Sequence, residues 1–160
     1  NIMNDINKNT ITPNNANKSV SQHKQLDAIW SAMNLAVHTE RVCANKKIFS
    51  LNDGIEDNKR DLEQDDYIVT RIHESAINVY LYARRANRIR VTQDDPDSKK
   101  YRLDLIFESV LSCDELLDLI TIARPLYHLK TKKYENWIRM VVTTKSQLSA
   151  WYRSEKCRYH

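Results

Sequence analysis

The chain has 160 residues, of which 41% are hydrophobic and 29% are charged, so it can form one domain with a single core. One glycine and three prolines are too few for the turns of an all-β fold or for glycine-rich phosphate-binding loops. The three cysteines have neither CxxC nor CxxH spacing, and the sequence therefore predicts no disulfide framework, metal site or other cofactor.

The first 22 residues are rich in asparagine and poor in large apolar side chains. Such a segment buries too little apolar surface to offset its ordering entropy, so we expect residues 1–22 to form a flexible tail, or a segment that orders only against a neighbour. The sequence shows no apolar signal segment and no run of about 18 apolar residues. We therefore expect a cytoplasmic protein that does not contact a membrane.

Apolar residues recur at every third or fourth position in four segments, which predicts helices at about 24–48, 65–91, 98–124 and 131–155. A short connection between the last two makes them antiparallel neighbours. The predicted fold is all-α: an antiparallel four-helix bundle over residues 23–156, followed by a basic end at 157–160. The predicted core stripe of the first helix consists of Leu26, Ile29, Trp30, Met33, Val37, Arg41 and Ala44. The stripe predicted for the second helix is Ile68, Ile72, Ala76, Val79, Ala83, Ala86 and Ile89, and that for the fourth is Tyr134, Trp137, Ile138, Val141, Leu148, Trp151 and Tyr152.

Three local signals mark the ends of these helices. Residues 50–66 carry seven acidic residues in a connection longer than most helix-to-helix loops, which indicates an insertion or a mobile acidic loop. Asp95 to Ser98 fits a cap for the third helix. Pro125 predicts the end of that helix at Arg124, because the residue before a proline disfavours the α conformation.

Positive charge gathers toward the end of the chain, where residues 124–160 hold nine basic and two acidic residues. Cations on outward helix faces can contact phosphates without reading sequence, although the same pattern also describes a solvated bundle face or a surface for an acidic protein. The arginines that end the second helix also suit its macrodipole. The predicted nucleic-acid-binding residues are Arg84, Arg85, Arg88, Arg90, Lys132, Lys133, Arg139, Lys145 and Arg153.

Residues 25–155 resemble the four-helix-bundle accessory variability determinant (Avd-like) proteins of diversity-generating retroelements. The likeness is carried by the run TIARPLYHLKTKKYENWIRMVVTTKSQLSAWYRS, in which the family positions fall on Ala123, Leu129, Tyr134, Leu148 and Trp151. Where family members often have glycine before the final tryptophan, this chain has serine and alanine, and its acidic insertion is longer than expected.

The resemblance implies a non-enzymatic partner of a retroelement reverse transcriptase. Such a protein would bind the polymerase and its template RNA during mutagenic retrohoming, and would assemble as a homo-oligomer, a pentamer in this family. The small proteins encoded in intervening sequences of large ribosomal RNA genes share the bundle, so a helical protein–protein interaction module is the alternative.

An enzyme is a further alternative. Arg153 and His160 have an Arg-x6-His spacing that resembles the active motif of HEPN-type ribonucleases, in which histidine could act as general acid or base and arginine could stabilise the phosphorane charge. His160 is the last residue of the sequence, and one such pair in a basic segment arises easily by chance. We therefore expect no catalytic activity.

Overall fold

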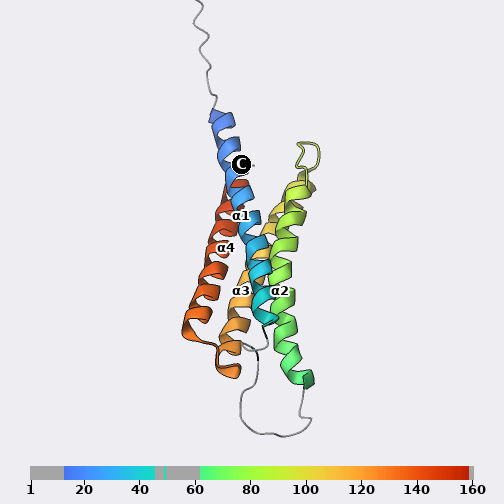
Figure 1. Ribbon diagram of the computed structural model, residues 1–160. Coiled ribbons are helices and arrows are strands. Elements are labelled where there is room, and N and C mark those ends of the chain that lie inside the picture. Colours follow the sequence, from blue (N-terminus) through green and yellow to red (C-terminus); the bar gives the residue numbers. More distant parts are fainter. Residues whose placement is uncertain (1–12, 46–48, 50–61, 159–160) are drawn as a thin grey trace, which may run out of the picture.

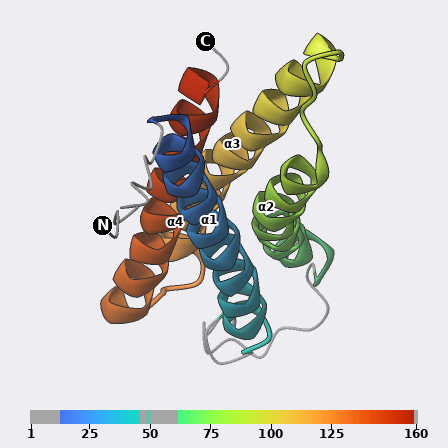
Figure 2. The same cartoon turned by 90° about the horizontal axis from the view of Figure 1, so that it is seen from above.

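The computed structural model describes residues 13–45, 49 and 62–158, and the side chains of residues 22–45, 49 and 67–158. These residues form four helices and no strand: α1 (Pro13–Cys43), α2 (Leu62–Arg88), α3 (Pro96–Leu126) and α4 (Thr131–Arg158). The helices run alternately down and up along a common direction (Figure 1). α1 and α3 each pack against both α2 and α4 (Figure 2). The predicted all-α antiparallel bundle is therefore confirmed.

The first helix begins at Pro13, well before the predicted start at residue 24. Proline suits a first helical turn, because its φ angle is already helical and its missing N–H has no partner there. Residues 13–22 of the predicted tail are thus helical, and α1 starts beyond the upper ends of the other helices (Figure 1). Residues 1–12 lie outside the described part of the chain.

Helix α1 ends at Cys43 rather than at residue 48, and a turn follows in which the Ala44 N–H donates to the Glu40 carbonyl at 2.9 Å. The predicted acidic connection covered residues 50–66. Residues 50–61 lie outside the described part of the chain, whereas residues 62–66 already belong to α2. The second helix therefore starts three residues earlier than predicted.

The second helix also ends three residues earlier than predicted, at Arg88. The next carbonyl, that of Ile89, accepts a hydrogen bond from Arg102 Nη1 at 2.9 Å instead of continuing the helix. After this connection, the Asp95 carboxylate accepts from the backbone N–H groups of Asp97 and Ser98, both at 3.2 Å. The predicted cap of α3 is therefore confirmed.

The prediction that Pro125 ends α3 is wrong. The proline lies inside the last turn of this helix. The turn remains hydrogen-bonded because residues beyond the proline supply the donors: the N–H groups of Tyr127 and Leu129 reach the carbonyls of Ala123 and Arg124 at 2.9 and 3.0 Å. His128 adopts φ 50°, the left-handed conformation that commonly follows a helix end. The following helix, α4, continues to Arg158, three residues beyond its predicted end, so only residues 159–160 of the predicted basic end lie outside the described chain.

The core stripes predicted for α2 and α4 are largely buried. α2 contributes Ile72, Ala76, Val79, Ala83 and Ala86, and α4 contributes Trp137, Val141, Leu148 and Trp151. Each of these helices offers one dominant apolar face, so periodicity alone identified which side packs inward.

The core stripe predicted for α1 is wrong except at Ile29, which is buried. Leu26, Trp30 and Val37 are 61%, 63% and 43% exposed. The buried side of α1 instead consists of Ala28, Ile29, Ala32, Leu35 and Thr39. Its alanines let the neighbouring helices approach closely, and the buried Trp137 indole Nε1 donates to Thr39 Oγ1 at 3.1 Å. Close packing and this hydrogen bond turn the bulkier apolar row outward.

A buried polar network at the upper end of the bundle also fixes the rotation of α1. The Arg102 guanidinium donates to Glu155 Oε1 at 3.1 Å, to Gln25 Oε1 at 3.2 Å and to the Ile89 carbonyl. The Gln25 amide in turn donates to Asn87 Oδ1. The network thus joins side chains from all four helices, and Gln25 could not keep both partners if α1 turned about its axis.

Candidate nucleic-acid interface

Two hollows of about 230 and 200 Å³ lie one after the other along the seam between α1 and α4. We call them together the α1–α4 groove. The upper hollow is lined by Ser31, Asn34, Arg139, Met140, Thr143 and Thr144. The lower hollow is lined by His38, Arg41, Val42, Lys133 and Asn136.

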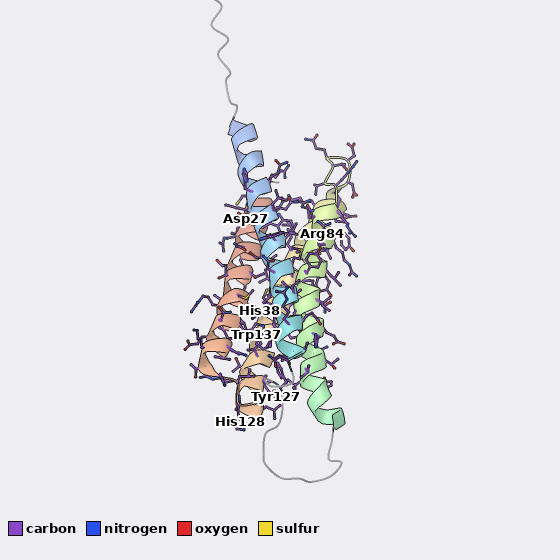
Figure 3. All side chains as sticks on the ribbon, in the orientation of Figure 1. Asp27, His38, Arg84, Tyr127, His128 and Trp137 are labelled. Atoms are coloured by element: carbon purple, nitrogen blue, oxygen red, sulfur yellow. The ribbon has the colours of Figure 1, made fainter. Side chains whose placement is uncertain are left out.

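The two helices place these side chains in matching rows. On α1 the lining positions are mostly three or four residues apart, and the same holds on α4, so each set lies along one side of its helix. The hydrogen bond between Thr39 and Trp137 joins the two helices beside these rows. Figure 3 shows His38 and Trp137 at a similar height in the bundle. The groove therefore lies along a seam held by a specific hydrogen bond.

The α1–α4 groove is positive and rich in hydrogen-bonding groups. Arg41, Lys133 and Arg139 contribute three cations, and none of the eleven lining residues is acidic. Burial and, to a lesser extent, the nearby Arg41 lower the pKa of His38 below its ordinary value. An anion is the ligand that this arrangement suits best, with hydroxyl and amide side chains available as further donors.

The predicted nucleic-acid-binding residues of α4 fall into two groups. Lys133 and Arg139 line the groove. Lys132 is exposed in the first turn of α4, and Arg153 is exposed near the opposite end of the same helix. Lys145 lies on the other side, where its ammonium pairs with the Asp114 carboxylate of α3. Lys145 therefore does not belong to the groove surface.

The predicted arginines at the end of α2 and just after it lie away from the groove, because α2 and α4 occupy opposite corners of the bundle. Arg84 lies near the upper end of α2 (Figure 3). Arg85 stacks over the Tyr82 ring, with its guanidinium carbon 5.8 Å from the ring centroid. Arg88 and Arg90 line a separate hollow with two carboxylates, those of Asp95 and Asp97. The nine predicted residues therefore do not form one continuous surface.

Arg41 is a groove residue that was not predicted from the sequence. It was assigned to the core stripe of the first helix, together with Trp30 and Val37, whereas the structure leaves it exposed. The usable signal was its position relative to Ser31, Asn34 and His38, which form a polar row at helical spacing on the same helix.

The other candidate chemistry gains no support from the described residues. His160, needed for the ribonuclease-like pair with Arg153, lies outside them. Burial is the main cause that raises the pKa of the Cys43 and Cys113 thiols to about 12, so neither is a ready nucleophile at neutral pH. Within the described ranges, no group of three or more histidine, cysteine, aspartate or glutamate side chains could hold a metal ion.

None of the helices in the described part of the chain is both long and apolar enough to span a membrane. Comparison of the chain with protein-family models, curated proteins and solved structures found no match. The resemblance to retroelement accessory proteins therefore rests on the sequence motifs alone.

Proposed function

We propose that this chain is a non-enzymatic nucleic-acid-binding protein whose α1–α4 groove holds a phosphate backbone. The observation that carries the proposal is the convergence of Arg41, Lys133 and Arg139 on a groove without acidic lining residues. Phosphate contacts position a nucleic acid without reading its bases, which suits a groove lined by hydroxyl and amide groups.

The resemblance gives this proposal a biological setting. In that setting the nucleic acid is the template RNA of a diversity-generating retroelement, and the protein partner is its reverse transcriptase. The chain would then act as an accessory protein, assembled as a homo-oligomer, during mutagenic retrohoming. Light scattering on the purified protein tests the assembly, since a monomer at all concentrations contradicts it.

The proposed RNA contact is tested by measuring affinity for a single-stranded RNA across a series of salt concentrations. The triple variant Arg41→Gln, Lys133→Gln, Arg139→Gln removes three candidate phosphate contacts. Each lost contact with a single strand makes the negative slope of log affinity against log salt less steep by about 0.7, so we expect its steepness to decrease by about 2.

The matched control removes the same number of charges from α2, through Arg84→Gln, Arg85→Gln and Arg88→Gln. We expect this variant to keep the salt slope of the original protein, because these arginines lie away from the groove. Equal losses in the two variants would mean that RNA senses net charge alone, which contradicts the proposed site. Failure of the original protein to bind RNA would leave a helical protein–protein interaction module.

A further inference from the structure

An apolar surface lies on the other side of α1 from the α4 seam. It contains Leu26 and Trp30, each more than 60% exposed, together with the partly exposed Val37. Their spacing of four and seven residues places them on one side of the helix. On α2, Ile77 and Leu81 are each 39% exposed and lie one helical turn apart. Exposed apolar clusters of this kind commonly mark interaction sites.

Two hydrogen-bonded pairs set the register of the antiparallel α1 and α2. Gln25 contacts Asn87 near the upper end, and Glu40 contacts the His73 imidazole further down. Counting inward from these pairs brings Trp30 level with residues 82–83, next to Leu81, and Val37 level with residues 75–76, next to Ile77. Ile77 also lies one turn from His73, so it is on the side of α2 that faces α1. We call these five residues, Leu26, Trp30, Val37, Ile77 and Leu81, the α1–α2 apolar face.

The upper rim of this face is positively charged. Arg84, Arg85 and Arg88 follow Leu81 by three, four and seven residues, so they continue the same side of α2. Among the described residues, no carboxylate forms an ion pair with any of the three, whereas Arg71, further down the helix, pairs with both Glu74 and Glu115.

We propose that the α1–α2 apolar face is a docking site for an amphipathic helix that carries acidic residues beside its apolar stripe. The exposed row from Leu26 to Val37 extends about 16 Å, which matches about three turns of a helix. Two parallel rows of apolar side chains on adjacent helices form the kind of surface into which a third helix packs. The arginines of the upper rim would meet the carboxylates of the incoming helix.

Charge distinguishes this occupant from a second copy of the chain. A copy placed on the same face would bring its own Arg84, Arg85 and Arg88. The carboxylates of this face, Glu40 and Glu74, are already paired with His73 and Arg71. The carboxylates next to the rim, those of Asp95 and Asp97, share a hollow with the copy's own Arg88. A separate acidic helix supplies free carboxylates, and it does not depend on the nucleic-acid role proposed for the groove.

Trp30 provides a direct reporter of docking. The chain has three tryptophans, and Trp137 and Trp151 are 1% and 0% exposed. Acrylamide therefore quenches mainly Trp30, and a Trp30→Phe variant identifies its share of the fluorescence. The probes are two synthetic peptides of about 18 residues with the same leucine stripe, flanked by glutamates in one and by lysines in the other.

We expect the glutamate peptide to shield Trp30 from acrylamide in a saturable way, and to bind about tenfold more tightly than the lysine peptide at low salt. The triple variant Arg84→Gln, Arg85→Gln, Arg88→Gln should lose this preference. The groove triple variant should retain it, and so should Val142→Ser, which changes an apolar residue that is 50% exposed on α4.

Four outcomes would overturn the proposal. The glutamate peptide could fail to shield Trp30, or the two peptides could bind equally. Shielding that grows with protein concentration alone would identify a second copy as the occupant. Shielding by RNA or by anionic lipid vesicles, at concentrations where the glutamate peptide has no effect, would assign the face to those ligands. The groove triple variant should weaken RNA binding and retain the peptide preference, so the peptide test and the RNA test can fail independently.

Discussion

The two sides of helix α1 differ in the residues that they present. Toward α4 it presents Ser31, Asn34, His38 and Arg41, which line a polar, positive groove. On the side that continues onto α2 it presents Leu26, Trp30 and Val37, which are large, apolar and exposed. The residues between these sides, mostly small, face the core. One helix therefore supplies half of two chemically different surfaces.

The difference shows that apolar size did not decide how α1 packs. Burying Trp30 in place of Ala32 would remove more apolar surface from water, which by itself favours the opposite rotation. The observed rotation instead satisfies the buried Trp137 indole through Thr39, and it lets Gln25 join the network around Arg102. Leaving such buried polar groups without partners is costly. Polar partners thus specify the rotation of α1, and the apolar row remains free for another molecule.

The largest expected effect comes from breaking the network that holds α1 in this rotation. Arg102→Ala leaves the Glu155 carboxylate, fully buried beside Trp151, without its main cation. We expect the free energy of unfolding in urea to fall by about 3–5 kcal/mol. The double variant Arg102→Met, Glu155→Met removes both charges and should recover part of this loss. The control Arg153→Ala, at an exposed position on α4, should change stability by less than about 0.5 kcal/mol. A loss no larger than this control would contradict a role for the network.

A smaller effect is expected from the hydrogen bond along the groove seam. Thr39→Val keeps the side-chain shape but leaves the buried Trp137 N–H without its acceptor. The expected loss is about 1–3 kcal/mol in the same urea experiment. Thr143→Val changes an exposed threonine on the groove and serves as the control. If both variants unfold at the same urea concentration, the seam is not held by this bond.

The exposed apolar side of α1 should be nearly neutral for stability. Trp30→Ser should change the free energy of unfolding by less than about 0.5 kcal/mol, because the side chain is mostly in water. Leu35→Ala, on the buried side of the same helix, should cost about 2–5 kcal/mol. Chemical denaturation of the two variants compares the sides directly. The reverse order would show that α1 packs with Trp30 inward.

How far the sequence predicts this molecule depends on how many apolar stripes a helix carries. α2 and α4 each have one dominant stripe, and Ile72, Val79, Trp137 and Leu148 were correctly predicted to be buried. α1 has two competing stripes, and the more hydrophobic one was chosen wrongly. The deciding contacts come from Trp137 and Arg102, which lie far away in sequence, so periodicity within α1 could not reveal them.

The candidate site was predictable to a similar extent. Lys133 and Arg139 were predicted from the basic composition of the last helix, and both line the groove. Arg41 was not predicted, because the predicted core stripe of α1 placed it on the buried side of the helix. The separation of the α2 arginines from α4 follows from the bundle topology, since alternate helices of an antiparallel four-helix bundle occupy opposite corners. The number of charges along the chain does not show which helices are neighbours.

The smallest expected effect concerns the protonation of His38 in the groove. Its pKa is lowered by burial and by Arg41, so below about pH 6.5 the unfolded chain binds this proton more readily than the folded one. Stability should therefore decrease as the pH falls through this range, and His38→Gln should remove that contribution. Arg41→Gln removes one of the two causes, so it should raise the pKa of His38 toward its ordinary value.

Bound RNA should act on His38 in the opposite direction, because a phosphate near the imidazole favours its charged form. We expect the pKa of His38, followed by the NMR shifts of its ring protons, to rise when single-stranded RNA is added. A peptide bound to the α1–α2 apolar face should leave this titration unchanged. A free-protein pKa at or above the ordinary value would contradict the burial of His38 beside Arg41. A titration indifferent to RNA would contradict the proposed position of the phosphate backbone. The same histidine thus tests the groove separately from the surface on the other side of α1.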